Sequence, residues 1–285
     1  MAVALALFSA LFYGLADFVG GFVSRRTSSW PVAVVGQLSS AVCTAVLAST
    51  ASGDPRGADF AWAVLGGIGS GTGTGFLYRG FASGRMSVVA PVSAVGTAVL
   101  PVLVGVLVGE RPASLAWVGI LVAFPAIWLV SSVPADDLAG LDDRPGRASL
   151  AEGVWDGVLA GVGFGLLFVA LGQIPDGAGL WPLATAQSVS VPAVVVLALV
   201  IGEAWLPRDR RVGWALVTGP VGTGATLCFL LAAQRGFLSV AGVLASLYPA
   251  STVLLAALVL RERIHRAQAA GLALCAVAVS LVVLG

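Results

Sequence analysis

Apolar and polar positions in this chain form long blocks, without the short alternation that a strand would show. Mostly apolar runs of about 20 residues are bounded by charged residues, Pro or Gly. A bilayer core about 30 Å thick is crossed by about 20 helical residues that rise about 1.5 Å each. The pattern therefore predicts ten transmembrane helices, over residues 3–23, 31–49, 60–78, 87–108, 114–133, 154–172, 181–201, 212–233, 239–260 and 267–284.

One polar stretch divides the ten predicted spans into two sets of five. Residues 134–150 contain four Asp, two Arg and two Pro, which is typical of a solvated loop. We therefore predict a first five-helix repeat over residues 1–133, a polar linker over 134–150 and a second repeat over 151–285.

The two halves resemble each other in sequence. A shift of 152 residues superposes several uncommon residues, and near the start of the chain the best shift is 151. The matched positions are Trp62 with Trp214, Gly67 with Gly219, Glu110-Arg111 with Glu262-Arg263, Gly119 with Gly271, and Trp30-Pro31 with Trp181-Pro182. Because five is an odd number of spans, the second repeat must enter the membrane from the opposite side, which makes the repeat inverted.

The arginines test this inversion independently, because short cytoplasmic loops retain positive charge. Loops one to four carry two, one, two and one Arg, whereas their counterparts in the second half carry none, three, one and three. Over the whole chain, odd-numbered loops hold 12 Arg and even-numbered loops hold 3. Taken alone, this distribution places the odd loops in the cytoplasm and both termini outside.

Composition agrees with a membrane protein. Hydrophobic residues make up 58% of the 285 residues, charged residues 10%, and the mean hydropathy is +1.00. A soluble domain carries about 25% charged residues. The net charge of +1 provides no basic field for nucleic acid. All basic residues are Arg, which is typical of a GC-rich bacterial genome. We expect a multi-pass protein of the cell membrane, specifically the bacterial inner membrane.

Soluble catalytic chemistry has little support in the sequence. The three Cys lie far apart in apolar runs, and His265 is the single histidine, so we predict no metal site and no cofactor. The glycines of residues 69–76 do not fit the spacing of a nucleotide-binding loop. Those at 67, 71 and 75, like those at 157, 161 and 165, recur every four residues, which favours close helix packing in lipid. We expect no enzyme activity.

Two acids lie inside apolar spans, Asp17 and Asp156. An Asp in the middle of a transmembrane helix costs about 2.5–3.5 kcal/mol and needs compensation. Asp17 suits a group that couples transport to protons or binds a cation. Alternatively, it forms a hydrogen bond between helices or reaches toward Arg25 or Arg26. Asp156 begins the sixth span, where an interfacial helix cap is the simpler interpretation.

Residues 246–271 carry a recognisable pattern. Pro249 is followed by a long apolar run, then by Glu262-Arg263, Gln268 and Gly271. The first half holds a weaker copy, with Pro91 and Pro101 before Gly109-Glu110-Arg111 and Gly119. The pattern resembles the signature of EamA-type transporters of the drug/metabolite transporter superfamily. It departs from the usual form at Arg261, where a Gly is expected, and at Ala116, the counterpart of Gln268.

The resemblance implies a pseudo-two-fold transporter with a central cavity. Spans one, three and four would line the cavity together with spans six, eight and nine, while spans five and ten lie outside. It also implies cytoplasmic termini, which is opposite to the arginine distribution.

Polar and aromatic side chains on the predicted inner spans are candidates for a substrate or proton pathway. Besides Asp17, they are Tyr13, Tyr78, Gln187, Gln234 and Tyr248. Gln37 in the second span adds a further polar group. Each of these side chains can instead serve as an interhelical hydrogen bond or an interfacial anchor. We expect Glu110, Arg111, Glu262 and Arg263 to pair or cap at helix ends as structural groups.

These observations favour a secondary transporter of a small organic solute or metabolite that works by alternating access, outward in direction and coupled to protons through Asp17. An intramembrane enzyme acting on a lipid-linked substrate, or a membrane scaffold that transports nothing, are the alternatives. The expected partners are the bilayer and a small-molecule substrate, with the protein a monomer or a homodimer.

Overall fold

The computed structural model describes residues 1–83, 86–132, 147–259 and 264–285, and over these residues the chain is all-helical. Ten helical spans follow one another, two of them built from two pieces. They are α1 (Ala2–Ser24), α2 (Ser29–Thr50), α3 (Gly57–Ala82), α4 (Met86–Leu107), α5 (Ser114–Ser131), α7 (Arg147–Gly172), α8 (Trp181–Ile201), the 3-10 helix η1 (Arg210–Val217) with α9 (Thr218–Ala233), α10 (Leu238–Ala245) with α11 (Tyr248–Val259), and α12 (Arg266–Leu284). The predicted ten-helix membrane fold is confirmed.

The predicted spans agree with these helices to within a few residues, with one larger difference. Nine of the ten spans are long and apolar enough to cross a membrane, within the part of the chain that the structure describes. The remaining span, α3, is long enough, but the glycines in its middle lower its mean hydropathy. The helix α7 begins at Arg147, earlier than the predicted residue 154 and inside the predicted linker. Hydropathy marks only the apolar part of a helix, so a polar first turn escapes it.

The ninth span is interrupted and the eighth changes from a 3-10 to an α-helix, whereas the sequence pattern predicted two uniform helices. In the ninth span, α10 ends at Ala245 and α11 begins at Tyr248. Pro249 has no N–H to donate to the carbonyl of Ala245, and around this point the backbone uses i→i−3 bonds, from Leu247 N to Leu244 O and from Ala250 N to Leu247 O. In the eighth span, Pro220 likewise cannot donate to the carbonyl of residue 216, and the span begins as a 3-10 helix. Non-helical backbone at membrane depth occurs where it is buried or lines a cavity.

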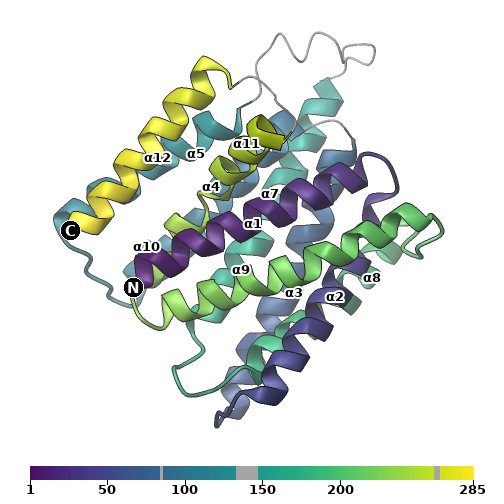
Figure 1. The fold of residues 1–285 in the computed structure, drawn as a ribbon, viewed down its shortest axis with the longest axis horizontal. Coiled ribbons are helices and arrows are strands. Elements are labelled where there is room, and N and C mark those ends of the chain that lie inside the picture. The colour runs from purple at the N-terminus through teal and green to yellow at the C-terminus, as the bar shows by residue number, and fades with distance from the viewer. Residues whose placement is uncertain (84–85, 133–146, 260–263) are drawn as a thin grey trace.

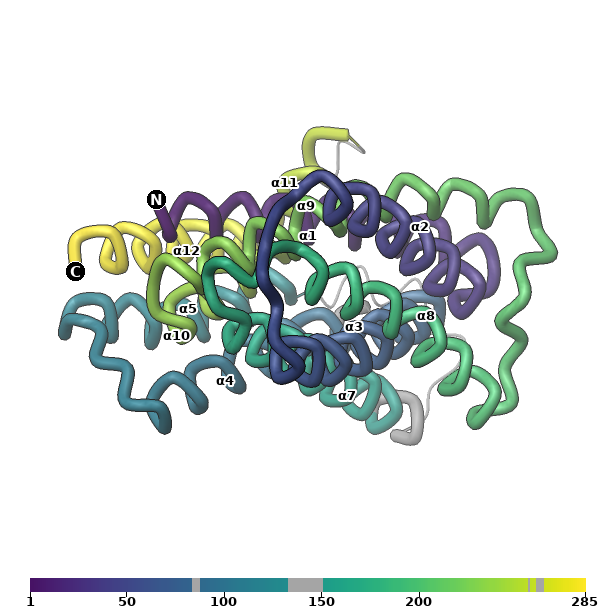
Figure 2. Tube along the Cα trace, turned by 90° about the horizontal axis from the view of Figure 1, so that it is seen from below, coloured from purple at the N-terminus to yellow at the C-terminus, as the bar shows by residue number. Residues whose placement is uncertain are grey.

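The helix packing follows a pseudo-two-fold arrangement of the two inverted repeats. The helix α3 packs on α7 and α8, and its counterpart α9 packs on α1 and α2. Likewise α4 packs on α7, while α10 and α11 pack on α1. The helices α5 and α12 pack on each other. Figure 1 and Figure 2 show both termini at the same end of the bundle, as an even number of spans requires.

Small residues allow close contact at equivalent places in the two repeats. A Cβ atom added at Gly67 of α3 would overlap the backbone of Ala186 on α8. A Cβ atom at the matching Gly219 of α9 would overlap Ser39 on α2. Close backbone approach is the main way in which helices gain contact energy in lipid.

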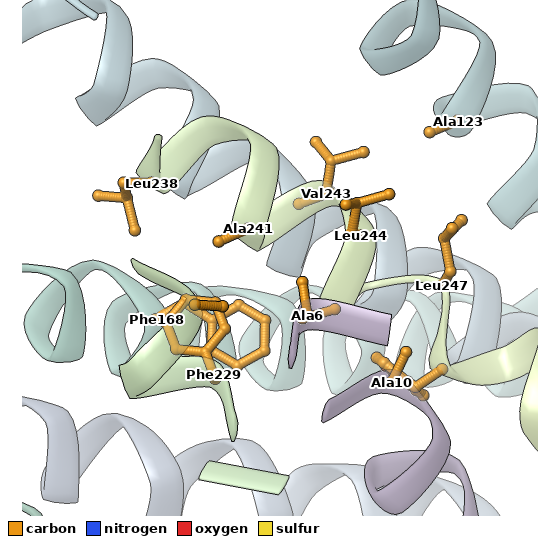
Figure 3. Close-up of a cluster of buried hydrophobic side chains, with 14 of the residues drawn as sticks. Ala6, Ala10, Ala123, Phe168, Phe229, Leu238, Ala241, Val243, Leu244 and Leu247 are labelled. Atoms are coloured by element: carbon orange, nitrogen blue, oxygen red, sulfur yellow. The ribbon is translucent and has the colours of Figure 1, made fainter. Parts of the chain in front are cut away.

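The outer surface is apolar, and the buried core lies between the repeats. Large apolar side chains that face outward include Leu121 and Trp128 on α5, Val162 on α7 and Val200 on α8. Figure 3 shows part of the core, where Phe168 of α7 and Phe229 of α9 lie ring against ring near α10. Their centroids are 4.0 Å apart. An apolar exterior of this kind fits a lipid environment and leaves the polar residues to the interior.

Candidate functional site

A cavity lies in the middle of the bundle between the two repeats. Side chains from α1, α2, α3 and α4 of the first repeat and from α7, α8, α9 and α11 of the second line it. These are the inner helices that the resemblance implied, with α2 and α8 in addition. The helices α5 and α12 contribute no lining residue among the described ones. The cavity is therefore a joint product of the two repeats.

Residues at equivalent positions of the two repeats line the same cavity. Six pairs of lining residues are related by the shifts found in the sequence. With a shift of 151 they are Tyr13 with Phe164, Ala16 with Leu167, Asp17 with Phe168 and Gly36 with Gln187; with a shift of 152 they are Ser70 with Gly222 and Thr74 with Thr226. The matched helices thus present the same faces to the centre, but the side chains on those faces differ.

Asp17 is the single charged residue among the described residues that line the cavity. It lies on α1 and is 9% exposed. Among the described residues it forms no hydrogen bond and no ion pair. The interhelical hydrogen bond and the contact with Arg25 or Arg26 that the sequence left open are therefore not what the structure shows. A carboxylate in such a place lacks the compensation that membrane burial calls for.

Three tyrosines surround this part of the cavity. Tyr13 is on α1, Tyr78 on α3 and Tyr248 at the first residue of α11, and all three line the cavity together with Asp17. The rings of Tyr13 and Tyr248 are 6.5 Å apart, and the hydroxyl of Tyr248 lies 3.3 Å from Ser93 Oγ. The hydroxyl of Tyr13 is buried without a hydrogen-bond partner.

Two glutamines add neutral polar groups to the lining of the cavity. Gln37 of α2 donates from Nε2 to Ser70 Oγ (3.0 Å) and to Thr74 Oγ1 (2.9 Å) on α3. Gln187 of α8 donates from Nε2 to Ser40 Oγ at 2.5 Å, while its Oε1 is buried and has no hydrogen-bond partner. The amide of Gln187 is 2% exposed, so this oxygen is a free acceptor inside the bundle.

The structure brings five of the six predicted pathway residues together. Asp17, Tyr13, Tyr78, Gln187 and Tyr248 line the cavity. Gln234 is not among the lining residues that the structure describes. Its Nε2 donates to the carbonyls of Ile174 and Pro175, which follow α7, at 3.3 and 3.1 Å. Gln234 thus closes a helix end near the bundle surface, away from Asp17.

The remaining predicted residues lie at helix ends or deeper in the interface between repeats. Asp156 is fully buried and forms an ion pair with Arg79 of α3, whose Nε donates to Oδ1 at 2.9 Å. The expected interfacial cap is therefore wrong, because α7 begins nine residues earlier than Asp156 and carries this residue into the bundle. The sequence could not show this, since hydropathy placed Asp156 at the edge of the sixth span.

Glu110 lies just after α4 and caps the start of α10. Its carboxylate oxygens accept hydrogen bonds from the backbone N–H groups of Leu238 (2.5 Å) and Ser239 (2.9 Å). Arg111 lies beside it in the loop before α5. Glu262 and Arg263, the matching pair of the second repeat, lie outside the described residues.

Several lining residues were not singled out from the sequence. They are small hydroxyl residues on inner helices, chiefly Ser40, Ser70, Thr74, Thr97 and Thr226, and the aromatic pair Phe164 and Phe168. Ser70 and Thr74 are four residues apart in an otherwise apolar or glycine-rich span, and this spacing marks one helix face. The phenylalanines could have been found by applying the repeat shift to Tyr13 and Asp17. No cluster of metal-ligating residues exists within the described ranges.

Comparison with known proteins identifies the second half of the chain. Residues 152–284 match the profile of the EamA-like transporter family. This half is an EamA-like transporter domain. The family is part of the drug/metabolite transporter superfamily, as the residues around Pro249 indicated.

A second comparison concerns the fold of the whole chain. A solved structure, described only as "Crystal structure of protein", is 16% identical and superposes with a TM-score of 0.70. The match covers 99% of this chain and 96% of the other. Curated proteins gave no match. The EamA-like domain therefore sits in a chain whose complete ten-span fold has a solved counterpart.

Proposed function

We propose that this protein is a secondary transporter that moves a small organic solute outward by alternating access of its two repeats around the central cavity. The observation that carries the proposal is Asp17, an uncompensated carboxylate in a cavity that residues of both inverted repeats line. Midplane sites at the interface of inverted repeats are typical of secondary transporters. Neither an intramembrane enzyme nor a scaffold calls for this arrangement.

Contacts between the repeats support alternating access. The ion pair of Arg79 with Asp156 and the hydrogen bonds of Glu110 to Leu238 and Ser239 each join the first repeat to the second. Arg79 lies at the end of α3 and Glu110 just after the end of α4, and these helices run in opposite directions. The two contacts therefore lie toward opposite ends of the cavity, where they can hold one end closed while the other opens.

Asp17 is the group through which transport is coupled to protons. The titratable side chains that line the cavity with it, among the described residues, are Tyr13 on its own helix, Tyr78 on α3 and Tyr248 on α11. All are neutral near pH 7 in their ordinary state. A proton or a ligand can then neutralise Asp17, and competition between the two exchanges one for the other.

Flux measurements in proteoliposomes test this function. Vesicles would be loaded with a low-molecular-mass extract of host cells, and the solutes that leave would be identified by mass spectrometry. With an imposed proton gradient, we expect wild-type vesicles to release a defined solute that protein-free vesicles retain. Asp17→Asn, which mimics the protonated form, should abolish gradient-driven release. Asp17→Glu should keep gradient-driven release.

The control for this experiment is Asp209→Asn. Asp209 caps η1 at the exposed start of the eighth span, where Asn is an equally good cap. Its flux should equal that of the wild type at matched protein levels. Wild-type vesicles that release nothing beyond protein-free vesicles would overturn the transport proposal. Equal pH profiles for wild type and Asp17→Asn would end the coupling role of Asp17 alone.

The orientation follows the arginine distribution in this proposal, with both termini outside. Single cysteines at positions 2, 140 and 284 in a cysteine-free background would be labelled with an impermeant reagent. We expect positions 2 and 284 to react from outside and position 140 only from inside. The reverse result would favour the orientation that the family resemblance implies.

A further inference from the structure

We propose that the solute is an organic cation, a primary or secondary amine that is protonated and carries an apolar or aromatic body. Its ammonium group would lie at Asp17 and its body along α7. This inference rests on the proposed function and adds the chemical class of the substrate. Three features of the cavity carry it: its charge, its free acceptors and the difference between its two walls.

The charge of the cavity selects against anions. Asp17 is the one charged side chain among the described residues that line it. Arg79, which follows the cavity residue Tyr78 on α3, is already paired with Asp156 and does not line the cavity. A ligand carboxylate would therefore meet only a like charge, whereas an ammonium group supplies the compensation that Asp17 lacks.

Aromatic rings and free acceptors line the same cavity as Asp17. Tyr13, Tyr78 and Tyr248 line the cavity around Asp17, and the faces of tyrosine rings attract cations. Buried Oε1 of Gln187 and the buried hydroxyl of Tyr13 have no hydrogen-bond partner. Buried polar atoms are normally satisfied, so a ligand N–H group can provide the missing donor. These two acceptors call for two N–H groups, which protonated primary and secondary amines carry, whereas a protonated tertiary amine has one and a quaternary ammonium none.

The difference between the α1 and α7 walls of the cavity predicts a ligand with one charged end and one apolar end. At the positions that match Tyr13 and Asp17, α7 presents Phe164 and Phe168, and Leu167 lies between them. Phe168 is held by its stacking on Phe229, with centroids 4.0 Å apart. The α1 wall is thus acidic, while the α7 wall is apolar and fixed. A molecule with a cationic head and an apolar body satisfies both walls at once.

A set of four matched probes tests the assignment on purified full-length protein at neutral pH. They are 2-phenylethylamine, its N,N,N-trimethyl derivative, the neutral 2-phenylethanol and the anionic 3-phenylpropanoate. Equilibrium binding would be measured by calorimetry. We expect the primary amine to bind best, the trimethyl derivative and the alcohol more weakly, and the carboxylate not at all.

The variants separate charge recognition from general damage. Asp17→Asn should weaken binding of the amine by about 30-fold or more and leave the alcohol unchanged, because it removes one partner of a buried charge pair. Asp17→Glu should keep the preference for the amine, and Asp209→Asn should bind all four probes as the wild type does. Lowering the pH should weaken binding of the amine to the wild type, since protons compete for Asp17, but not to Asp17→Asn.

The outcomes distinguish this inference from the proposed function. Binding of the alcohol or the carboxylate as tight as that of the amine would overturn the cation assignment, even where vesicles transport a solute. Amine binding that Asp17→Asn leaves unchanged would also overturn it. Selective amine binding together with vesicles that transport nothing would keep the site and refute the transporter.

Discussion

The two repeats of this protein share their packing but not their chemistry. Gly67 in the first repeat and Gly219 in the second let equivalent helix pairs approach closely. In contrast, the cavity positions occupied by Tyr13 and Asp17 in the first repeat hold Phe164 and Phe168 in the second. The two repeats thus share a scaffold, while the charge lies in the first repeat alone among the described residues that line the cavity.

The difference shows which constraints act on both repeats. Each repeat must pack the same helices in the same bilayer, so small residues are needed at matching contacts. A charge at membrane depth is costly, and one carboxylate suffices to neutralise one cation or proton. A second carboxylate at position 168 would repel the first across the cavity and would not contact an apolar ligand.

The largest effect is expected from breaking the shared packing. Gly67→Leu and Gly219→Leu should each prevent accumulation of folded protein, because the new side chain overlaps the facing helix at either position. Gly57→Leu is the matched control, since nothing lies within 4 Å of an added Cβ there. Monodispersity after detergent extraction and thermal unfolding are the measurements. A folded Gly219→Leu protein beside a lost Gly67→Leu protein would show that the two contacts are not equivalent.

A smaller effect is expected from breaking the ion pair between Arg79 of α3 and Asp156 of α7. Arg79→Leu should lower stability by about 2 kcal/mol, because it removes the ion pair between Arg79 and the fully buried Asp156. Leu is also the residue that the repeat places at the matching position 231. The double variant Arg79→Leu, Asp156→Leu should recover most of this loss. Thermal unfolding of the three proteins tests it, and a double variant less stable than Arg79→Leu would refute the explanation.

The smallest effect is expected from replacing a residue of the α1 wall of the cavity by its counterpart on α7. Tyr13→Phe removes a buried hydroxyl without a partner, so stability should stay equal or rise by about 1 kcal/mol. Binding of 2-phenylethylamine should weaken about fivefold if that hydroxyl accepts from the ligand, a typical loss for one hydrogen bond. The reciprocal Phe164→Tyr should leave amine binding unchanged. Calorimetry and thermal unfolding check both variants, and a clear loss of stability in Tyr13→Phe would mean that the hydroxyl is satisfied in the native protein.

The sequence by itself determined the membrane fold, the ten spans, the internal repeat and the prominence of Asp17. Each of these depends on local or periodic information. About 20 apolar residues suffice to define a span, five spans per repeat define the inversion, and a charged residue inside a span is visible without any knowledge of its neighbours.

Only the tertiary structure decided which side chains meet. It placed Tyr13, Tyr78, Gln187 and Tyr248 around one cavity and left Gln234 at a helix end. The rotation of each helix about its own axis is set by contacts with several neighbours at once. The sequence therefore does not show whether a polar residue on an inner span points into the cavity. The burial of Asp156 was decided in the same way, because the first turns of α7 are buried only where neighbouring helices cover them. The break before Tyr248 likewise persists where neighbouring helices enclose the irregular backbone.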